Sequence, residues 1–275
     1  MTTPEADSED FGVRSEVSRA KNNNAFFYSA AEKHFHQPRE KVKRLSTGSK
    51  HFNDLLSGGL EIGEISQFYG GPYTGKTHLC HLLCVTLPCR YRAIYIDTKG
   101  TFCEEKIRGI VEANRSKWKN ILTRIQLAQP KDAKEQELII EEACSSVKSD
   151  SNSKITLLIV DSMMFHYEAE YPGLSDLVAR AHRLNIYMHN LRILGLTSKI
   201  AVVITNESTS NPRHEEVDDP RPFGGKIISH ISTYIIHLKG TSRGTMLLDL
   251  FGSLAKVRRI HSKDNNTYPR STSIG

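Results

Sequence analysis

The chain has 275 residues, of which 38% are hydrophobic and 25% charged, and its formal net charge is +6 at pH 7. This length suits one large domain, or one domain plus an extension. No apolar stretch approaches the roughly 18 residues that a membrane-spanning helix needs, and the start, MTTPEADSED, is acidic and polar, unlike a secretion signal. We therefore expect no membrane partner. The positive charge permits a nucleic-acid partner and equally fits a solvated basic surface.

Five cysteines stand at positions 80, 84, 89, 103 and 144. Their spacing fits neither a CxxC pair nor a zinc site. We expect reduced thiols in or near a core, and hence an intracellular protein. Its place would be cytoplasmic or nucleoid-associated, or nuclear in a eukaryotic source.

The first part of the chain differs in pattern from the rest. Residues 1–22 are polar and without periodicity, which predicts a disordered tail. Residues 23–44 combine an aromatic cluster with the basic run REKVKR, and Pro38 argues against one long helix. We interpret this stretch as a linker or docking segment. The predicted domain covers 45–275.

From residue 45 onward, apolar runs alternate with helical periods. We expect a short capped helix within 45–60 that ends at a Gly-Gly pair. The strands should follow at 63–70, 93–97, 121–130, 154–162, 199–206, 233–238, 245–252 and 255–262. The helices should lie at 77–87, 101–115, 134–148, 174–196 and, in short form, within 223–232. Strands that alternate with helices, including the continuously apolar run 157–160, predict an α/β fold with a mainly parallel central sheet flanked by helices.

One Gly-rich turn matches the phosphate-binding pattern GxxxxGK[ST] without a mismatch, between a predicted strand and a predicted helix. Its glycines let the backbone point N–H groups at phosphate oxygens, and the helix adds its positive dipole end. Lys76 would reach the β- and γ-phosphates, and the Thr77 hydroxyl would hold Mg²⁺. The predicted nucleotide-binding residues are Gly70, Gly71, Pro72, Tyr73, Thr74, Gly75, Lys76 and Thr77.

Polar residues close three of the predicted strands. Asp161 ends LLIVD, where a metal-anchoring acid is expected beside a phosphate loop. Asp97 ends AIYID and is a secondary candidate, which would position water or the neighbouring turn. Asn206 and Glu207 end the strand AVVIT, at the edge where ligands bind in open α/β sheets. This polar pair would sense the γ-phosphate or simply begin a loop.

Several stretches together resemble the RecA/RadA recombinases, nearest to archaeal RadA and its eukaryotic counterparts. They are LSTGSKHFNDLLSGGLEIGEISQFYG, GPYTGKTHLCHLLCVT, AIYIDTKGTF, LLIVDS, AVVITN and FGGKIISHIS, in family order between about 27 and 265. The resemblance implies a RecA-like P-loop ATPase core, ATP and Mg²⁺ as cofactors, and a role in homologous recombination or DNA repair. Only 26 residues precede Phe27, so we expect no helical N-terminal DNA-binding domain.

The resemblance also gives the linker a role. Family members dock through a Phe-x-x-Ala segment that enters a pocket on the next subunit, and this chain has Phe27-Tyr28-Ser29-Ala30. Phe27 would be the aromatic anchor, and Ala30 the small residue of a tight site. The partner would be a RadA-like recombinase or another copy of the chain. Alternatively, the aromatic cluster packs on its own domain.

The first departure from the family is Lys99, which stands in DTKGTF where the family has a glutamate that activates the attacking water. A protonated lysine has no acceptor and cannot do so. It can, however, balance phosphate charge. We expect retained ATP binding and slow hydrolysis. A lysine neutralised by burial and a lysine turned to solvent are the alternatives.

The second departure is Glu207, where the family has a glutamine after the strand-end Asn206. A glutamine can donate to the γ-phosphate, whereas an ionised glutamate cannot and would repel it. An ion pair between Lys99 and Glu207 would reconcile both departures. His230 matches a family position that contacts nucleotide across the subunit interface, and it equally fits an ordinary histidine of a short helix.

The third departure concerns single-stranded DNA, which the family holds with two loops. The first loop here has Glu168 and Leu174 where the family supplies arginines, and the second is rich in Glu and Asp. Such loops suit a phosphate backbone poorly. The basic runs 39–44 and 256–263 offer an alternative DNA surface or solvated faces. The candidate DNA-binding residues that remain are Arg180, Arg213, Arg221 and Lys226.

Two functions follow from these patterns. One is an ATP-binding accessory protein that caps, loads or regulates a full recombinase with little turnover, and the three departures favour it. The other is an active DNA-dependent ATPase that forms filaments and exchanges strands. A third and more remote function is that of a RecA-fold ATPase in signalling. The FYSA and GGKIISH segments argue against it.

Overall fold

The computed structural model of the protein describes residues 42–112, 118–149, 154–209, 221–240, 246–252 and 255–261. The backbone divides the chain into residues 1–43 and 44–275, and the elements below belong to the second unit. The predicted tail, the linker up to residue 41, Phe27, Ala30 and Arg213 lie outside the described residues.

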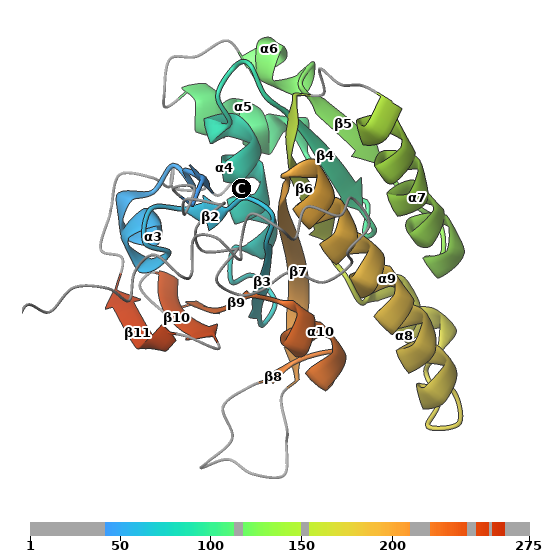
Figure 1. The fold of residues 1–275 in the computed structure, drawn as a ribbon. Coiled ribbons are helices and arrows are strands. Elements are labelled where there is room, and N and C mark those ends of the chain that lie inside the picture. Colours follow the sequence, from blue (N-terminus) through green and yellow to red (C-terminus); the bar gives the residue numbers. More distant parts are fainter. Residues whose placement is uncertain are drawn as a thin grey trace, which may run out of the picture. The chain divides into compact units, whose positions relative to one another are not determined.

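One large sheet runs through this unit, in the order β11-β10-β9-β3-β7-β6-β4-β5 (Figure 1). Neighbouring strands from β9 to β5 are parallel, whereas β10 and β11 are antiparallel. This confirms the predicted mainly parallel sheet. The strands are β3 (Ile65–Gly70), β4 (Arg92–Asp97), β5 (Ile125–Ala128), β6 (Ile155–Asp161), β7 (Ala201–Thr209), β9 (Tyr234–Gly240), β10 (Met246–Gly252) and β11 (Ala255–His261).

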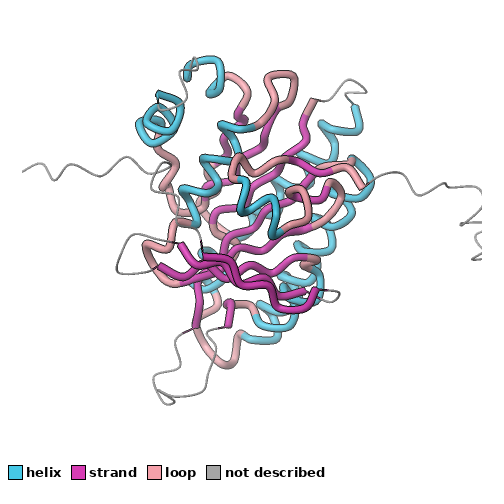
Figure 2. The backbone as a smooth tube through the Cα atoms, turned by 90° about the vertical axis from the view of Figure 1, so that its left-hand side faces the viewer, coloured by secondary structure: helices cyan, strands magenta, loops and turns pink. Residues whose placement is uncertain are grey.

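Helices flank the sheet, as the alternating pattern predicts (Figure 2). The helices are α3 (Lys50–Leu55), α4 (Lys76–Thr86), α5 (Glu104–Glu112), α6 (Trp118–Leu122), α7 (Ala133–Ser149), α8 (Phe165–Glu170), α9 (Leu177–Ser198) and α10 (Gly225–Ile231). One core cluster joins α3 and α4 to one face of the sheet. A second joins α7, α8, α9 and α10 to the other face.

The alternation of side chains along the strands creates the two cores. On β6, Leu157 and Ile159 pack into the cluster beneath α4, while Leu158 and Val160 pack into the cluster beneath α9, and all four are fully buried. A strand covered on both faces must be apolar throughout, which is why LLIV reads as a continuous run. Asp161 follows on the α4 side, so the fold places it on the same face as the phosphate loop.

Short elements and several element boundaries escape the sequence patterns. The strands β1 (Arg44–Leu45), β2 (Leu60–Glu61) and β8 (Arg221–Pro222) and the helices α6 and α8 were not expected. The predicted strand over 121–130 is wrong in its first part, because Ile121 and Leu122 end α6. Ile121 packs there against Ile107 and Val111 of α5.

The cysteines are not all in the core. Cys80 and Cys84 are buried on α4, Cys103 and Cys144 are partly buried, and Cys89 is exposed in the turn before β4. The expectation of core or near-core thiols is therefore wrong for Cys89, which follows Pro88 in a turn between a helix and a strand. Among the described helices, none combines the length and apolar character that crossing a membrane requires.

Candidate nucleotide-binding site

The phosphate loop connects β3 to α4, as predicted. Gly75 precedes the helix in the left-handed region with φ 91°, and no side chain caps the helix start. The first N–H groups of α4 are thus left available to an anion. Gly70 is required at the start of the loop, because a Cβ there would lie 2.3 Å from the Leu238 carbonyl oxygen. At the tip, Tyr73 has φ 61° and a fully exposed side chain.

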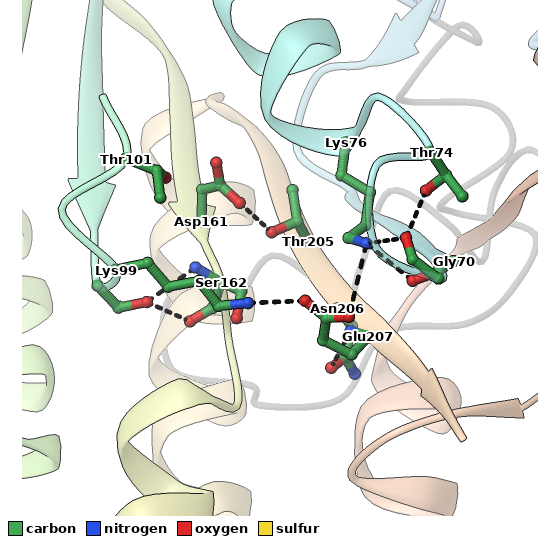
Figure 3. Close-up of polar contacts among 12 residues, drawn as sticks. Gly70, Thr74, Lys76, Lys99, Thr101, Asp161, Ser162, Thr205, Asn206 and Glu207 are labelled. Carbon is green, nitrogen blue, oxygen red and sulfur yellow. Dashed lines mark hydrogen bonds and ion pairs between the residues drawn. The ribbon is translucent and has the colours of Figure 1, made fainter. Parts of the chain in front are cut away.

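Lys76 lies beneath this loop (Figure 3). Its Nζ atom donates hydrogen bonds of 2.8 Å to the carbonyl oxygens of both Gly70 and Gly71. Burial lowers the pKa of Lys76, and the neighbouring Glu207 carboxylate opposes this shift. These two charge-assisted bonds hold the Lys76 ammonium against the first two residues of the phosphate loop.

Asp161 ends β6, and its side chain is held by two hydroxyl groups. Tyr95 donates a hydrogen bond of 2.8 Å to Oδ2, and Thr205 donates one of 2.5 Å to Oδ1. Asp161 is only 3% exposed. Tyr95 and Thr205 were not singled out from the sequence. The sequence showed only that both hydroxyl side chains stand in predicted strands, and the pairing of β4, β6 and β7 brings them to Asp161.

Asp97 has a different surrounding. Its Oδ1 accepts a hydrogen bond from the backbone N–H of Thr101 at 3.0 Å, and its Oδ2 accepts bonds from the N–H of Phe102 at 2.8 Å and from Gln129 at 3.2 Å. The carboxylate thus closes the turn that carries Lys99. Of the two roles considered for Asp97, this geometry favours positioning the turn.

Lys99 and Glu207 form the ion pair that the sequence suggested. Lys99 Nζ lies 2.7 Å from Glu207 Oε1, and Lys76 Nζ lies 3.9 Å from Glu207 Oε2. Burial acts to raise the pKa of Glu207, but the hydrogen bond from Lys99 and the charges of both lysines outweigh it, so the pKa lies below its usual value. Lys99 also lies 5.8 Å from the centre of the Phe165 ring. The Lys99 side chain therefore contacts Glu207 and Phe165 and does not simply extend into solvent.

Asn206 and His230 lie at different depths. Asn206 is fully buried. Its amide donates a 2.6 Å hydrogen bond to the Phe223 carbonyl, and its Oδ1 accepts one from the Glu207 N–H at 2.9 Å. It therefore ties β7 to the segment before α10. The expectation that Asn206 and Glu207 end this strand is wrong, because β7 continues to Thr209, where Ser208 and Thr209 pair with β8. His230 is exposed in the last turn of α10.

The described candidates for DNA contact come from three elements. Arg180 in α9 donates a 3.2 Å hydrogen bond to the Tyr171 carbonyl. Arg221 in β8 and Lys226 in α10 are exposed. Glu168 in α8 is partly buried, and burial raises its pKa although the charges of Arg180 and Lys99 act in the opposite direction. Leu174, in the same first loop, is 87% exposed.

Two comparisons with known proteins agree with this fold. The sequence model of the Rad51 family matches residues 38–253. A relative from Drosophila melanogaster, described as "DNA repair protein Rad51 homolog", is 33% identical over 228 residues, which cover 80% of this chain and 67% of the relative. Together with the mainly parallel sheet, these matches show that the chain belongs to the Rad51 family, within the RecA/RadA recombinases.

Proposed function

We propose that this chain is an ATP-binding member of the Rad51 family that acts in homologous DNA recombination and repair as an accessory protein with weak ATP hydrolysis. The observation that carries this proposal is the 2.7 Å contact between Lys99 and Glu207. It places a cation paired with a carboxylate where the family resemblance implies a water-activating glutamate and a phosphate-sensing glutamine.

Nucleotide binding is supported by the donors that surround the loop. The uncapped start of α4, the left-handed Gly75 and the Lys76 ammonium together suit a polyphosphate. Thr77 and Asp161 offer the hydroxyl and carboxylate oxygens that Mg²⁺ prefers. Across the described ranges, no group of three His, Cys, Asp or Glu side chains could hold a metal by itself, so Mg²⁺ would also need nucleotide phosphates. ATP with Mg²⁺ would supply the phosphoryl chemistry of the family.

Weak hydrolysis follows from the chemistry of residue 99. A general base must accept a proton from the attacking water. The Lys99 ammonium has only donors, and its Nζ lies 2.7 Å from Glu207 Oε1. The Glu207 carboxylate is itself bonded to Lys99. Neither side chain is thus free to activate water.

A partner would supply the full recombinase activity. We propose docking to a RadA-like recombinase or to another copy through Phe27 and Ala30, and weak contact with single-stranded DNA through Arg180, Arg213, Arg221 and Lys226. The second candidate, an active DNA-dependent ATPase that forms filaments, is favoured by one observation. The phosphate loop is intact, and Asp161 is held by hydrogen bonds from Tyr95 and Thr205, as an enzyme that binds Mg²⁺–ATP would also require.

ATP binding and ATP turnover, measured with and without single-stranded DNA, separate the two candidates. The accessory function predicts binding that Lys76→Ala abolishes, together with turnover that stays near the Lys76→Ala background whether or not DNA is present. Turnover well above that background and stimulated by DNA would support the filament-forming enzyme instead. Absence of any nucleotide binding would overturn both.

A further inference from the structure

Glu207 is fixed beside the phosphate loop by the sheet. In the parallel pairing of β3 with β7, Glu207 is the register partner of Gly70, the first residue of the loop. Its backbone N–H is bonded to Asn206, and its carbonyl oxygen accepts a 3.1 Å hydrogen bond from the Phe223 N–H. The backbone of residue 207 is thus held on both sides. The carboxylate can leave this place only by rotation of its own side chain.

The carboxylate also lies close to where a phosphate would bind. Lys76 Nζ is 3.9 Å from Glu207 Oε2. A phosphate oxygen that accepts a hydrogen bond from a lysine lies about 2.8 Å from the nitrogen. The Glu207 carboxylate and a phosphate bound at Lys76 would therefore both lie close to the same ammonium group. Figure 3 shows Lys76 directed toward both Gly70 and Glu207.

Part of the local positive charge is already neutralised without a terminal phosphate. Glu207 stands between two cations, with Oε1 on Lys99 at 2.7 Å and Oε2 toward Lys76 at 3.9 Å. Its lowered pKa means that it is ionised at neutral pH, when it has only acceptor oxygens. The ionised carboxylate cannot donate a hydrogen bond to a phosphate. A phosphate that shared Lys99 or Lys76 would weaken the contact of that cation with Glu207.

We propose that the Glu207 carboxylate, held by Lys99, takes the position and charge of the terminal phosphate of a nucleoside triphosphate, and so makes this site favour a nucleoside diphosphate. The inference rests on the proposed nucleotide-binding function and names the ligand that the site prefers. A diphosphate leaves the Lys99–Glu207 pair intact. Binding of a triphosphate requires that Glu207 rotate away or remain against a like charge.

The test is the ratio of two affinities. Titration calorimetry with Mg²⁺–ADP and Mg²⁺–ATP is carried out on the full chain and on Glu207→Gln, Lys99→Met, Lys76→Ala and Glu64→Gln. Glu64→Gln is the matched control, because Glu64 is also partly buried and ion-paired, to Arg192 at 3.0 Å, but lies just before the opposite end of β3.

We expect the unmodified chain to bind ADP at least as tightly as ATP. Glu207→Gln should strengthen ATP binding about tenfold and change ADP binding less than about twofold, since it removes one charge without changing shape. Lys99→Met should weaken ATP more than ADP, since it leaves the Glu207 charge and removes its counter-ion. Glu64→Gln should change neither affinity.

Two outcomes would overturn the inference while leaving nucleotide binding established. One is ATP binding at least about tenfold tighter than ADP binding in the unmodified chain. The other is a Glu207→Gln variant, folded by circular dichroism, whose ATP-to-ADP ratio is unchanged. If neither nucleotide binds the unmodified chain, or if Lys76→Ala leaves both affinities intact, the proposed function fails together with the inference.

Discussion

Thr205 on β7 donates a hydrogen bond of 2.5 Å to the carboxylate of Asp161 on the neighbouring strand β6. With the Tyr95 hydroxyl on the other oxygen, it fixes the orientation of the one acid that we assign to Mg²⁺. Mutation of a residue that hydrogen-bonds to a metal ligand generally lowers metal affinity by about 10- to 100-fold. The hydroxyl of residue 205 should therefore matter for metal-dependent binding.

Thr205→Val keeps the shape of the side chain and removes its hydroxyl. We expect ATP affinity to fall about tenfold in the presence of Mg²⁺ and to change little in its absence, by analogy with other metal sites. Equilibrium binding of a fluorescent ATP analogue at several Mg²⁺ concentrations measures this. Thr205→Ser, which keeps the hydroxyl, should bind like the unmodified chain. Equal losses with and without Mg²⁺ would contradict a role through Asp161.

Asp97 should act on stability rather than on the metal. Its carboxylate accepts two backbone N–H bonds from the turn after β4 and is 1% exposed. Asp97→Ala leaves these buried donors unpaired and should cost about 2 kcal/mol in the free energy of unfolding. Urea unfolding measures the loss. The Mg²⁺ dependence of nucleotide binding should persist in Asp97→Ala and disappear in Asp161→Ala, and the reverse pattern would exchange their roles.

The Lys99–Glu207 pair should make a small contribution to folding. Both side chains are 28% exposed, so solvent screens the pair. A double-mutant cycle with Lys99→Met and Glu207→Gln should give a coupling of roughly 0.5–1 kcal/mol in the free energy of unfolding. Strictly additive effects would show that the two side chains are not coupled in solution. Lys106→Met, at an exposed lysine on α5, is the control for loss of charge alone.

His81 should make the fold sensitive to acid. It is fully buried on α4, and neither ring nitrogen has a hydrogen-bond partner among the described residues. Burial lowers its pKa from 6.5 to about 4. Because the unfolded chain then binds a proton more readily, stability is retained above about pH 6.5 and is lost as the pH falls toward 4, by up to about 3 kcal/mol.

His81→Leu removes this titration. Its stability relative to the unmodified chain should rise by about 1–2 kcal/mol between pH 7.5 and pH 5.5, as measured by urea unfolding at each pH. His189→Gln, at an exposed histidine of α9, should show no such trend. If His81→Leu loses as much stability at acid pH as the unmodified chain does, a group other than His81 causes the acid sensitivity.

The sequence predicted most of the large elements because buried strands and amphipathic helices have distinct periods. The run LLIV before Asp161 is buried on both faces of the sheet. Its continuous apolar pattern therefore identified a buried strand without knowledge of the tertiary structure. The strands of two residues and the helices α6 and α8 were missed because such short elements are decided by tertiary packing. Ile121, for instance, is helical because it packs on α5.

The site was predictable where a motif or a charge pattern carried it. The phosphate loop follows from its motif and Asp161 from a carboxylate that ends a strand, whereas the Lys99–Glu207 pair follows from two departures from the family pattern. The support from Tyr95 and Thr205 depends on the register of β4, β6 and β7, which no local pattern fixes. The bonds of Lys76 to its own loop likewise depend on a side-chain conformation.

The most direct test of weak hydrolysis is the steady-state ATP turnover of the Lys99→Glu, Glu207→Gln double variant beside the unmodified chain, with single-stranded DNA present. A correctly placed general base contributes about 10²- to 10⁴-fold. The double variant should therefore turn over ATP at least about 100-fold faster than the unmodified chain, and Lys76→Ala introduced into it should abolish the gain. An unmodified chain that already turns over ATP as fast as the double variant would contradict the assignment of Lys99 as the residue that limits hydrolysis.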